Sequence, residues 1–147
     1  MPVATRRWND PVEPGDGFRV LVCRYRPRGV TKEAEARLWE AWMPDLGPSR
    51  ELHADYWGKA SAGGTRLSWP EYRRRYLEEM MHPSGRGGVM LAALAARVAA
   101  GDTVTLLCSS ACTDPERCHR TLLAGLVEKA AARLAARPRS GARPSRP

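Results

Sequence analysis

The chain has 147 residues and a formal net charge of +8, and 43% of its residues are hydrophobic. This length fits one domain with a real core, and the composition argues against wholesale disorder. The first 17 residues contain no apolar run, and no stretch reaches the roughly 18 apolar residues that a membrane span needs. We therefore expect a cytoplasmic protein without membrane contact, whose four cysteines are metal ligands, catalytic residues or buried residues before they are disulfides.

The termini are expected to lie outside the folded domain. Residues 137–147, RPRSGARPSRP, carry four arginines and no acid, so they supply half of the net charge and predict a disordered tail. Residues 1–17 are expected to be a flexible segment, which leaves 18–136 as the domain. The positive charge is explained either by nucleic-acid binding or by genomic base composition alone.

The first half of the domain is predicted to contain one strand and one helix. FRVLVCRY (18–25) is apolar on both faces, as in a buried central strand. TKEAEARLWEAWM (31–43) predicts a helix with Thr31 as N-cap, which ends before Pro44. Residues 45–67 have the composition of a loop, with a short strand or turn at Glu51 to His53.

The second half predicts helices and a second buried strand. Ser68 is expected to cap a helix over 68–81, and a helix over 89–100 is expected to end at Gly101. TVTLLCS (103–109) predicts the strand. A long helix over 114–136 follows, with Asp114 as N-cap and Pro115 at its first position.

This alternation predicts a single α/β domain, with a small parallel sheet flanked by helices in a Rossmann-like three-layer arrangement. Two strands are too few for such a sheet, so one or two further short strands are expected around residues 51–56. Ligands of such sheets bind beyond the carboxyl ends of the strands. The loops at 24–29 and 108–114 follow the two predicted strands and carry unusual residues, so we expect the functional site there.

The order of several short motifs resembles the DUF488 family, which includes the YeaO-like proteins. The resemblance runs from about residue 18 to 130 and implies a fold and a site rather than a reaction. The matching residues are Arg26, Pro27, Arg28 and Gly29; Pro48, Ser49, Glu51 and Leu52; Trp69, Tyr72, Arg75, Tyr76 and Glu79; and Cys108, Cys118, His119 and Arg120. Many YeaO-like members lack the cysteines, so this sequence combines the signatures of two subgroups.

An anion site is the leading hypothesis for these residues. Cys118, His119 and Arg120 are predicted in the first turns of the last helix, where free N–H groups and the helix dipole attract anions and lower a thiol pKa. Arg26 and Arg28 could add forked donors to a phosphate, and we expect one of them to reach Cys118, His119 or Arg120.

The remaining candidates come from the Pro-Ser segment and the aromatic helix. Tyr76 and Glu79 could supply a hydroxyl and an acid or base, which with Cys118 and His119 gives the catalytic set. Ser49 and Arg75 join Arg26, Arg28 and Arg120 in the anion-binding set. The structural alternative is an ion pair between Arg28 and Glu79, with Tyr76 packed in the core.

Two other kinds of site remain open. No cofactor is expected, but zinc or iron could be held by Cys108, Cys118 and His119, although the spacing differs from the usual zinc knuckle. Alternatively, Cys112 and Arg117 have the spacing of a rhodanese loop, which would suit a thiolate nucleophile. Pro115 removes one of the N–H donors that such a loop needs, so Cys112 is assigned no role.

The expected function is therefore an anion-binding crevice for a phosphate-bearing small molecule or nucleic acid, with hydrolytic or transfer chemistry as an option. The alternative is a non-catalytic module that binds nucleic acid or a metal. His53 and His82 are expected at the surface. Trp57, beside glycine-rich sequence, is a candidate to line a cleft and stack on a ring.

Overall fold

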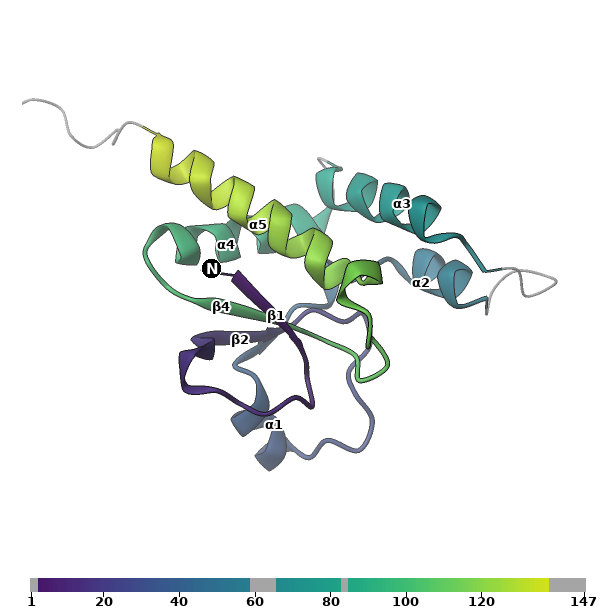
Figure 1. Cartoon of the computed structure of the whole chain (residues 1–147), viewed down its shortest axis with the longest axis horizontal. Helices are drawn as coiled ribbons and strands as arrows, with labels where there is room; N and C mark the ends of the chain where they lie inside the picture. The colour runs from purple at the N-terminus through teal and green to yellow at the C-terminus, as the bar shows by residue number, and fades with distance from the viewer. Residues whose placement is uncertain (1–2, 59–65, 83–84, 138–147) are drawn as a thin grey trace, which may run out of the picture.

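The computed structural model describes residues 3–58, 66–82 and 85–137, and the expected tail beyond residue 137 lies outside them. Four parallel strands form one sheet in the order β1-β4-β2-β3 (Figure 1). The strands are β1 (Val3–Arg7), β2 (Phe18–Leu21), β3 (Ala41–Trp42) and β4 (Val104–Cys108). The helices are α1 (Lys32–Leu38), α2 (Arg50–Trp57), α3 (Trp69–Met81), α4 (Arg86–Ala99) and α5 (His119–Ala136). The predicted α/β domain with a parallel sheet is confirmed.

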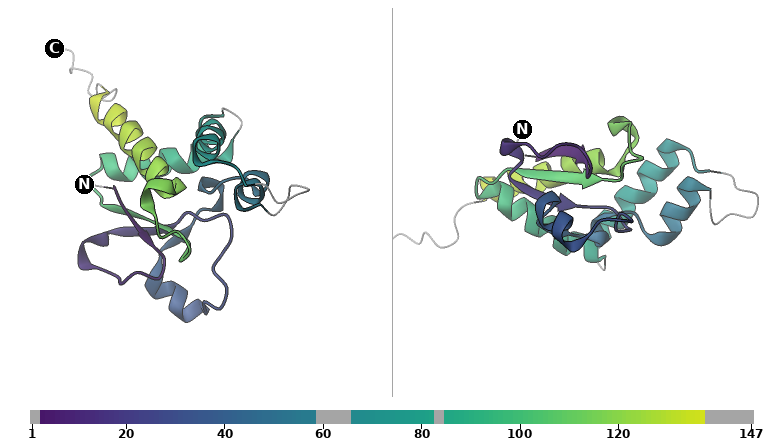
Figure 2. Two further views of the ribbon diagram at one scale, coloured as in Figure 1. Left: turned by 45° about the vertical axis from the view of Figure 1, so that its right-hand side comes forward. Right: turned by 90° about the horizontal axis from the view of Figure 1, so that it is seen from below.

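Alternating side chains of β2 and β4 divide the core between the two faces of the sheet. Val20 and Leu106 belong to a large cluster that α3, α4 and α5 cover, whereas Leu21 and Leu107 pack against Trp39 on the opposite face. Figures 1 and 2 show α4 and α5 side by side over one face and α1 on the other. Both faces of the central strands are therefore buried, as their apolar sequences predict.

The predicted flexible segment 1–17 instead contains an edge strand. β1 pairs with β4, with Val3 opposite Val104. Buried Asp16 ties the segment to the sheet, because its carboxylate accepts a hydrogen bond from Arg6 at 3.1 Å and one from Arg19. Gly17 has φ of +64°, and a Cβ there would lie 2.2 Å from the carbonyl oxygen of residue 103, so only glycine fits this turn.

The helix predicted over 31–43 ends early. Thr31 caps it as expected, by accepting a hydrogen bond from the Ala34 amide at 3.2 Å, but the chain becomes extended at Trp39. The following residues form β3, in which Ala41 pairs with Val20. Sheet pairing and the burial of the Trp39 ring thus override the helical periodicity.

Residues 51–56, where one or two short strands are expected from the sequence, are instead part of α2. Ser49 begins this helix by accepting a hydrogen bond from the Leu52 amide at 3.1 Å. The missing strands are β1 and β3. Ser68 caps α3, and Gly101, at φ of +103°, follows α4, both as predicted.

The last predicted helix is divided in two. Asp114 caps a short 3₁₀ helix, Pro115–Arg117, by accepting a hydrogen bond from the Glu116 amide at 3.0 Å. Cys118 is extended, at φ −133° and ψ 141°, and is the N-cap of α5. None of the helices in the described residues is both long and apolar enough to cross a membrane.

Candidate functional site

A cavity of about 520 Å³ lies at the carboxyl ends of β2 and β4, the position that the fold class predicts for ligands. The residues just after β2, the segment from the end of β4 to α5, and helices α2 and α3 all contribute to its wall. The lining includes Cys108, Cys112, Cys118, His119, Tyr25 and Trp57.

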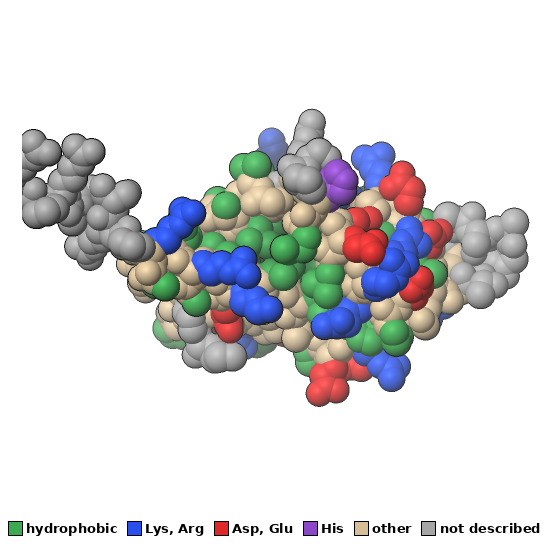
Figure 3. All heavy atoms as spheres, turned by 90° about the horizontal axis from the view of Figure 1, so that it is seen from above, with side chains coloured by type: hydrophobic (Ala, Val, Ile, Leu, Met, Phe, Trp, Pro, Cys, Tyr) green, Lys and Arg blue, Asp and Glu red, His purple; other side chains and the backbone are tan. Residues whose placement is uncertain are grey.

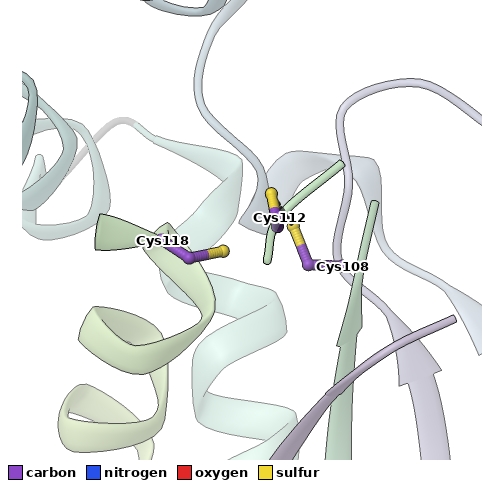
Figure 4. A group of neighbouring side chains, drawn as sticks. All are labelled: Cys108, Cys112 and Cys118. Carbon is purple, nitrogen blue, oxygen red and sulfur yellow. Dashed lines mark hydrogen bonds between the residues drawn. The ribbon is translucent and has the colours of Figure 1, made fainter. Parts of the chain in front are cut away.

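Three cysteines converge in this wall (Figure 4). Cys108 is the last residue of β4, Cys112 follows in the loop, and Cys118 precedes α5. Their Sγ atoms all lie within 4.8 Å of one another. The break between the 3₁₀ helix and α5 places Cys118 at the helix boundary, where its extended backbone lets the side chain point toward the other two. The sequence assigned Cys112 no role, so its membership of the cluster is a finding of the structure.

Hydrogen bonds within the cluster shift the pKa values of the three thiols in opposite directions. The Cys108 thiol donates to Cys112 Sγ across 3.3 Å. Hydrogen bonds from Cys108 and Cys118 lower the pKa of Cys112 to about 3, even though burial opposes this shift. The hydrogen bond to Cys112 raises the pKa of Cys108, and the hydrogen bonds to Cys108 and Cys112 raise the pKa of Cys118; burial raises both.

His119 is held in a defined orientation beside the cluster. Its ring is buried, and its Nε2 lies 2.8 Å from the carbonyl oxygen of Val22, so this nitrogen carries the hydrogen and donates it. Burial lowers the pKa of His119, which favours the neutral ring. Its Nδ1 then has a free lone pair, and it lies 3.8 Å from Cys108 Sγ.

Arg120 is buried next to this site but does not line the cavity. It is 5% exposed, and its Nε and one terminal nitrogen, Nη1, have no hydrogen-bond partner among the described residues. Its charge contributes to lowering the pKa of Asp10, behind the larger effect of the hydrogen bond from the backbone of Arg7. A buried guanidinium with unpaired donors is costly, so it calls for a ligand or a solvent molecule.

Two of the three arginines of the 24–29 loop, Arg26 and Arg28, lie outside the site. Arg26 forms an ion pair with Glu35 at 2.5 Å, and Arg28 is exposed. Neither lines the cavity, and within the described residues no interaction joins either one to Cys118, His119 or Arg120. The expected meeting of the two strand-end loops through these arginines is therefore not what the structure shows. Glu35, the fourth residue of α1, holds the Arg26 guanidinium away from the cavity.

A second cavity of about 490 Å³ collects other predicted residues. Ser49, Arg75 and Glu79 line it, and Arg24 lines both cavities. Glu79 accepts hydrogen bonds from the amide and hydroxyl of Ser49, and Arg75 pairs with Asp55 at 2.9 Å. Glu79 is thus bonded to Ser49 rather than paired with Arg28.

Tyr76 does not line either cavity. Its ring is fully buried, its hydroxyl donates to the carbonyl oxygen of Leu46 at 2.7 Å, and its ring centroid lies 5.4 Å from that of His119. Burial raises the pKa of Tyr76 well above its usual value. The structure therefore supports the core role that was the alternative for this residue.

The aromatic residues near α2 were partly anticipated. Trp57 lines the cavity, as its position beside glycine-rich sequence suggested. His53 was expected at the surface, but it lies in α2 and also lines the cavity, with its ring 5.1 Å from that of Tyr25. His82 is exposed, as expected, and lines the second cavity. The helical phase of α2 could have revealed His53, had that helix been predicted.

Charges of both signs share the face of the molecule in Figure 3. Acidic side chains lie among the Lys and Arg side chains on its right-hand side. Ion pairs elsewhere show the same mixing of charges, since Arg74 of α3 contacts both Glu71 and Glu78 at 2.8 Å. This face is therefore not a continuous basic surface.

Comparisons with known proteins agree with the motif resemblance. The family model DUF488-N3a, described as the active DUF488-N3 subclade, matches residues 3–131. The chain is also 31% identical over 87 residues to a protein of Escherichia coli (strain K12) named "Uncharacterized protein YeaO", and this match covers 59% of the chain and 69% of that protein. No solved structure matches the chain significantly.

Proposed function

The chain belongs to the DUF488 family, and from that premise we propose that Cys108, Cys112 and Cys118 form a metal-binding centre for zinc or iron. The observation that carries the proposal is the mutual approach of the three Sγ atoms, all within 4.8 Å. Ligands about 2.3 Å from a tetrahedral zinc ion are separated from one another by about 3.8 Å. Small movements of the thiols would therefore bring all three to bonding distance.

His119 supports the metal proposal through its hydrogen bond. Histidines at metal sites usually donate their second ring N–H to a carbonyl or carboxylate, which fixes the tautomer. His119 does this with the Val22 carbonyl, so the lone pair of Nδ1 is directed to the side of Cys108. The ring is suited either to complete the ligand set or to accept a proton from a ligand bound beside it.

The position of the centre in a cavity favours chemistry over a purely structural role. Structural zinc sites are closed by four protein ligands, whereas catalytic sites have three and keep one position open. Three cysteines in the wall of a 520 Å³ cavity match the second arrangement if His119 accepts a proton rather than completing the ligand set. The centre would act as a Lewis acid on a bound ligand, in a hydrolytic or transfer reaction.

Metal analysis of the purified protein tests this proposal. We expect about one zinc or iron per chain, and we expect Cys112→Ser and Cys118→Ser each to lose most of it. Cys23→Ser is the matched control, because Cys23 is a buried cysteine that lines the same cavity beside Cys108 but is not one of the three clustered sulfur atoms. Metal-free protein that stays metal-free after incubation with zinc or iron would contradict the proposal.

Anion binding at Arg120 is a second candidate function, supported by its two unpaired nitrogens. The anion would be a phosphate of a small molecule or of nucleic acid, held without help from Arg26 or Arg28. Arg120→Ala should weaken the binding of inorganic phosphate by about 1.5–3 kcal/mol, the range for hydrogen bonds to charged groups. Arg28→Ala is the control, and titration calorimetry is the measurement. Equal phosphate affinities of wild type and Arg120→Ala would exclude this site.

A further inference from the structure

Aromatic rings form a large part of the wall of the cavity beside the cysteines. Tyr25, His53, Tyr56, Trp57 and Tyr72 all line it. Tyr25 follows β2 and the other four belong to α2 and α3, whereas the cysteines come from β4, the loop after it and the N-cap of α5. Rings and sulfur atoms are therefore supplied by different elements around one space.

Two of these rings are more exposed than aromatic side chains in a packed core. Tyr25 is 50% exposed and Trp57 is 38% exposed. The His53 ring connects them, with centroids 5.1 Å from Tyr25 and 6.3 Å from Trp57, so the three form a continuous aromatic strip. The rings are inclined to one another, by 78° between Tyr25 and His53 and by 45° between His53 and Trp57, so each offers its own face. The guanidinium of Arg66 lies over the Trp57 ring, 5.0 Å from its centroid, which helps to hold the ring in place.

The segment between β4 and α5 adds polar groups to the same cavity. Ser109, Thr113, Asp114 and Arg117 line it, and their side chains carry hydroxyl, carboxylate and guanidinium groups. The volume of about 520 Å³ falls in the usual range for small-molecule sites. An inorganic anion would leave the aromatic strip unused, and an aliphatic chain would leave the polar groups unpaired. A planar heterocycle with hydrogen-bonding edges uses both.

We infer that this cavity binds a nucleobase, stacked on the Trp57 ring of the strip and flanked by Tyr25 and His53, with its edge hydrogen-bonded by side chains of residues 109–117. The inference deepens the proposed function by naming the substrate class, and it rests on that function only in placing the base beside a metal centre. The base could belong to a free nucleotide or to a single strand, because both offer the same stacking face.

Binding assays with defined probes test the inference on the metal-loaded protein. Adenine, adenosine, AMP and a single-stranded oligodeoxyadenylate of about ten nucleotides are titrated by calorimetry. Trp57→Leu should weaken the binding of the best probe about tenfold or more, because base stacking on one aromatic ring contributes that much. Trp57→Phe keeps a ring at the same position and should weaken binding less than about threefold. Tyr25→Leu, in an exposed loop, provides a second variant if Trp57→Leu fails to fold.

The probe set separates the two sources of the base. Tight binding of AMP or adenosine supports a free nucleotide or nucleoside, and binding of the oligonucleotide alone supports a base within a strand. The inference is overturned if none of the four probes binds, if Trp57→Leu and Trp57→Phe bind equally well, or if ribose 5-phosphate competes as strongly as AMP.

Metal content measured on the same samples keeps the two proposals separate. Trp57→Leu should retain its metal, because the proposed ligands are Cys108, Cys112 and Cys118 and the substitution leaves all three in place. A protein that carries metal but binds no base contradicts the inference alone. A protein that binds bases but never takes up metal contradicts the proposed function alone.

Discussion

Replacement of Arg120 by methionine should stabilise the protein in phosphate-free buffer, although it removes a charged residue next to the candidate site. The side chain is 5% exposed, and two of its nitrogens lack partners among the described residues. Each buried unsatisfied group costs about 1–3 kcal/mol. Methionine keeps a similar volume without these groups, so we expect the free energy of unfolding in urea to rise by about 1–4 kcal/mol.

Phosphate should reduce the stability advantage of Arg120→Met by about 2.7 kcal/mol if Arg120 binds an anion. A ligand at 100 times its dissociation constant stabilises the folded state by about 2.7 kcal/mol, and Arg120→Met should gain none of this. Arg117→Met is the control, since Arg117 is exposed and lies 4.0 Å from Asp114, and we expect a change of no more than about 0.5 kcal/mol. A loss of more than about 1 kcal/mol for Arg120→Met without phosphate would refute the reasoning, because it would mean that the buried donors are satisfied in solution.

Two further substitutions test the fold and its relation to the site. Tyr76→Phe leaves the Leu46 carbonyl oxygen without its donor and should cost about 1–3 kcal/mol in a urea titration with the metal content unchanged; unchanged stability with lost activity would instead support the catalytic role expected from the sequence. Asp16→Asn should cost about 3–5 kcal/mol, because it leaves buried Arg19 without its counter-charge. Burial alone raises the pKa of Asp16, but the Glu13 amide and the arginines more than offset this, so its pKa is lower in the folded state. The unfolded state therefore takes up the proton first, and wild-type stability should fall as the pH drops below about 4, whereas this dependence should be weaker in Asp16→Asn. Parallel pH titrations of stability that coincide would contradict this assignment.

The sequence predicted the elements whose signals are local. The cap residues Thr31, Ser68 and Asp114 each accept the hydrogen bond expected of them, and the apolar run at 103–109 is β4. Such signals depend on a few neighbouring residues, so they survive in the folded chain. The α/β class follows from their order alone.

The missed strands depend on contacts that are distant in sequence. β1, VATRR, is only partly buried and has no apolar run, and it is held by pairing with β4 and by the link from Arg6 to Asp16. β3 has two residues and is extended because it pairs with β2. Neither pairing leaves a periodic pattern in the sequence, so local propensity predicts a flexible segment over 1–17 and a helix over 31–43 instead.

The site was predicted in part for the same reason. The carboxyl edge of the sheet and Cys108, Cys118 and His119 follow from motif position and strand order. Cys112 joins them because the loop turns at this point, where the Cys112 amide donates a hydrogen bond to the Ser109 carbonyl oxygen at 3.0 Å. No regular spacing of residues in the sequence marks such a turn. The position of Arg26 in a strand-end loop predicts that it belongs to the site. Its pairing with Glu35 could not be predicted, because it depends on how the loop enters α1.

X-ray absorption at the metal edge tests the central claim most directly, because it counts the sulfur atoms bound to the ion. For the zinc-loaded protein we expect three sulfur ligands at about 2.3 Å, completed by one nitrogen or oxygen at about 2.0 Å. Cys112→Ser should lower the sulfur count by one or abolish metal binding. A spectrum of wild-type protein that contains only nitrogen and oxygen ligands, or a single sulfur, would contradict a centre built from Cys108, Cys112 and Cys118.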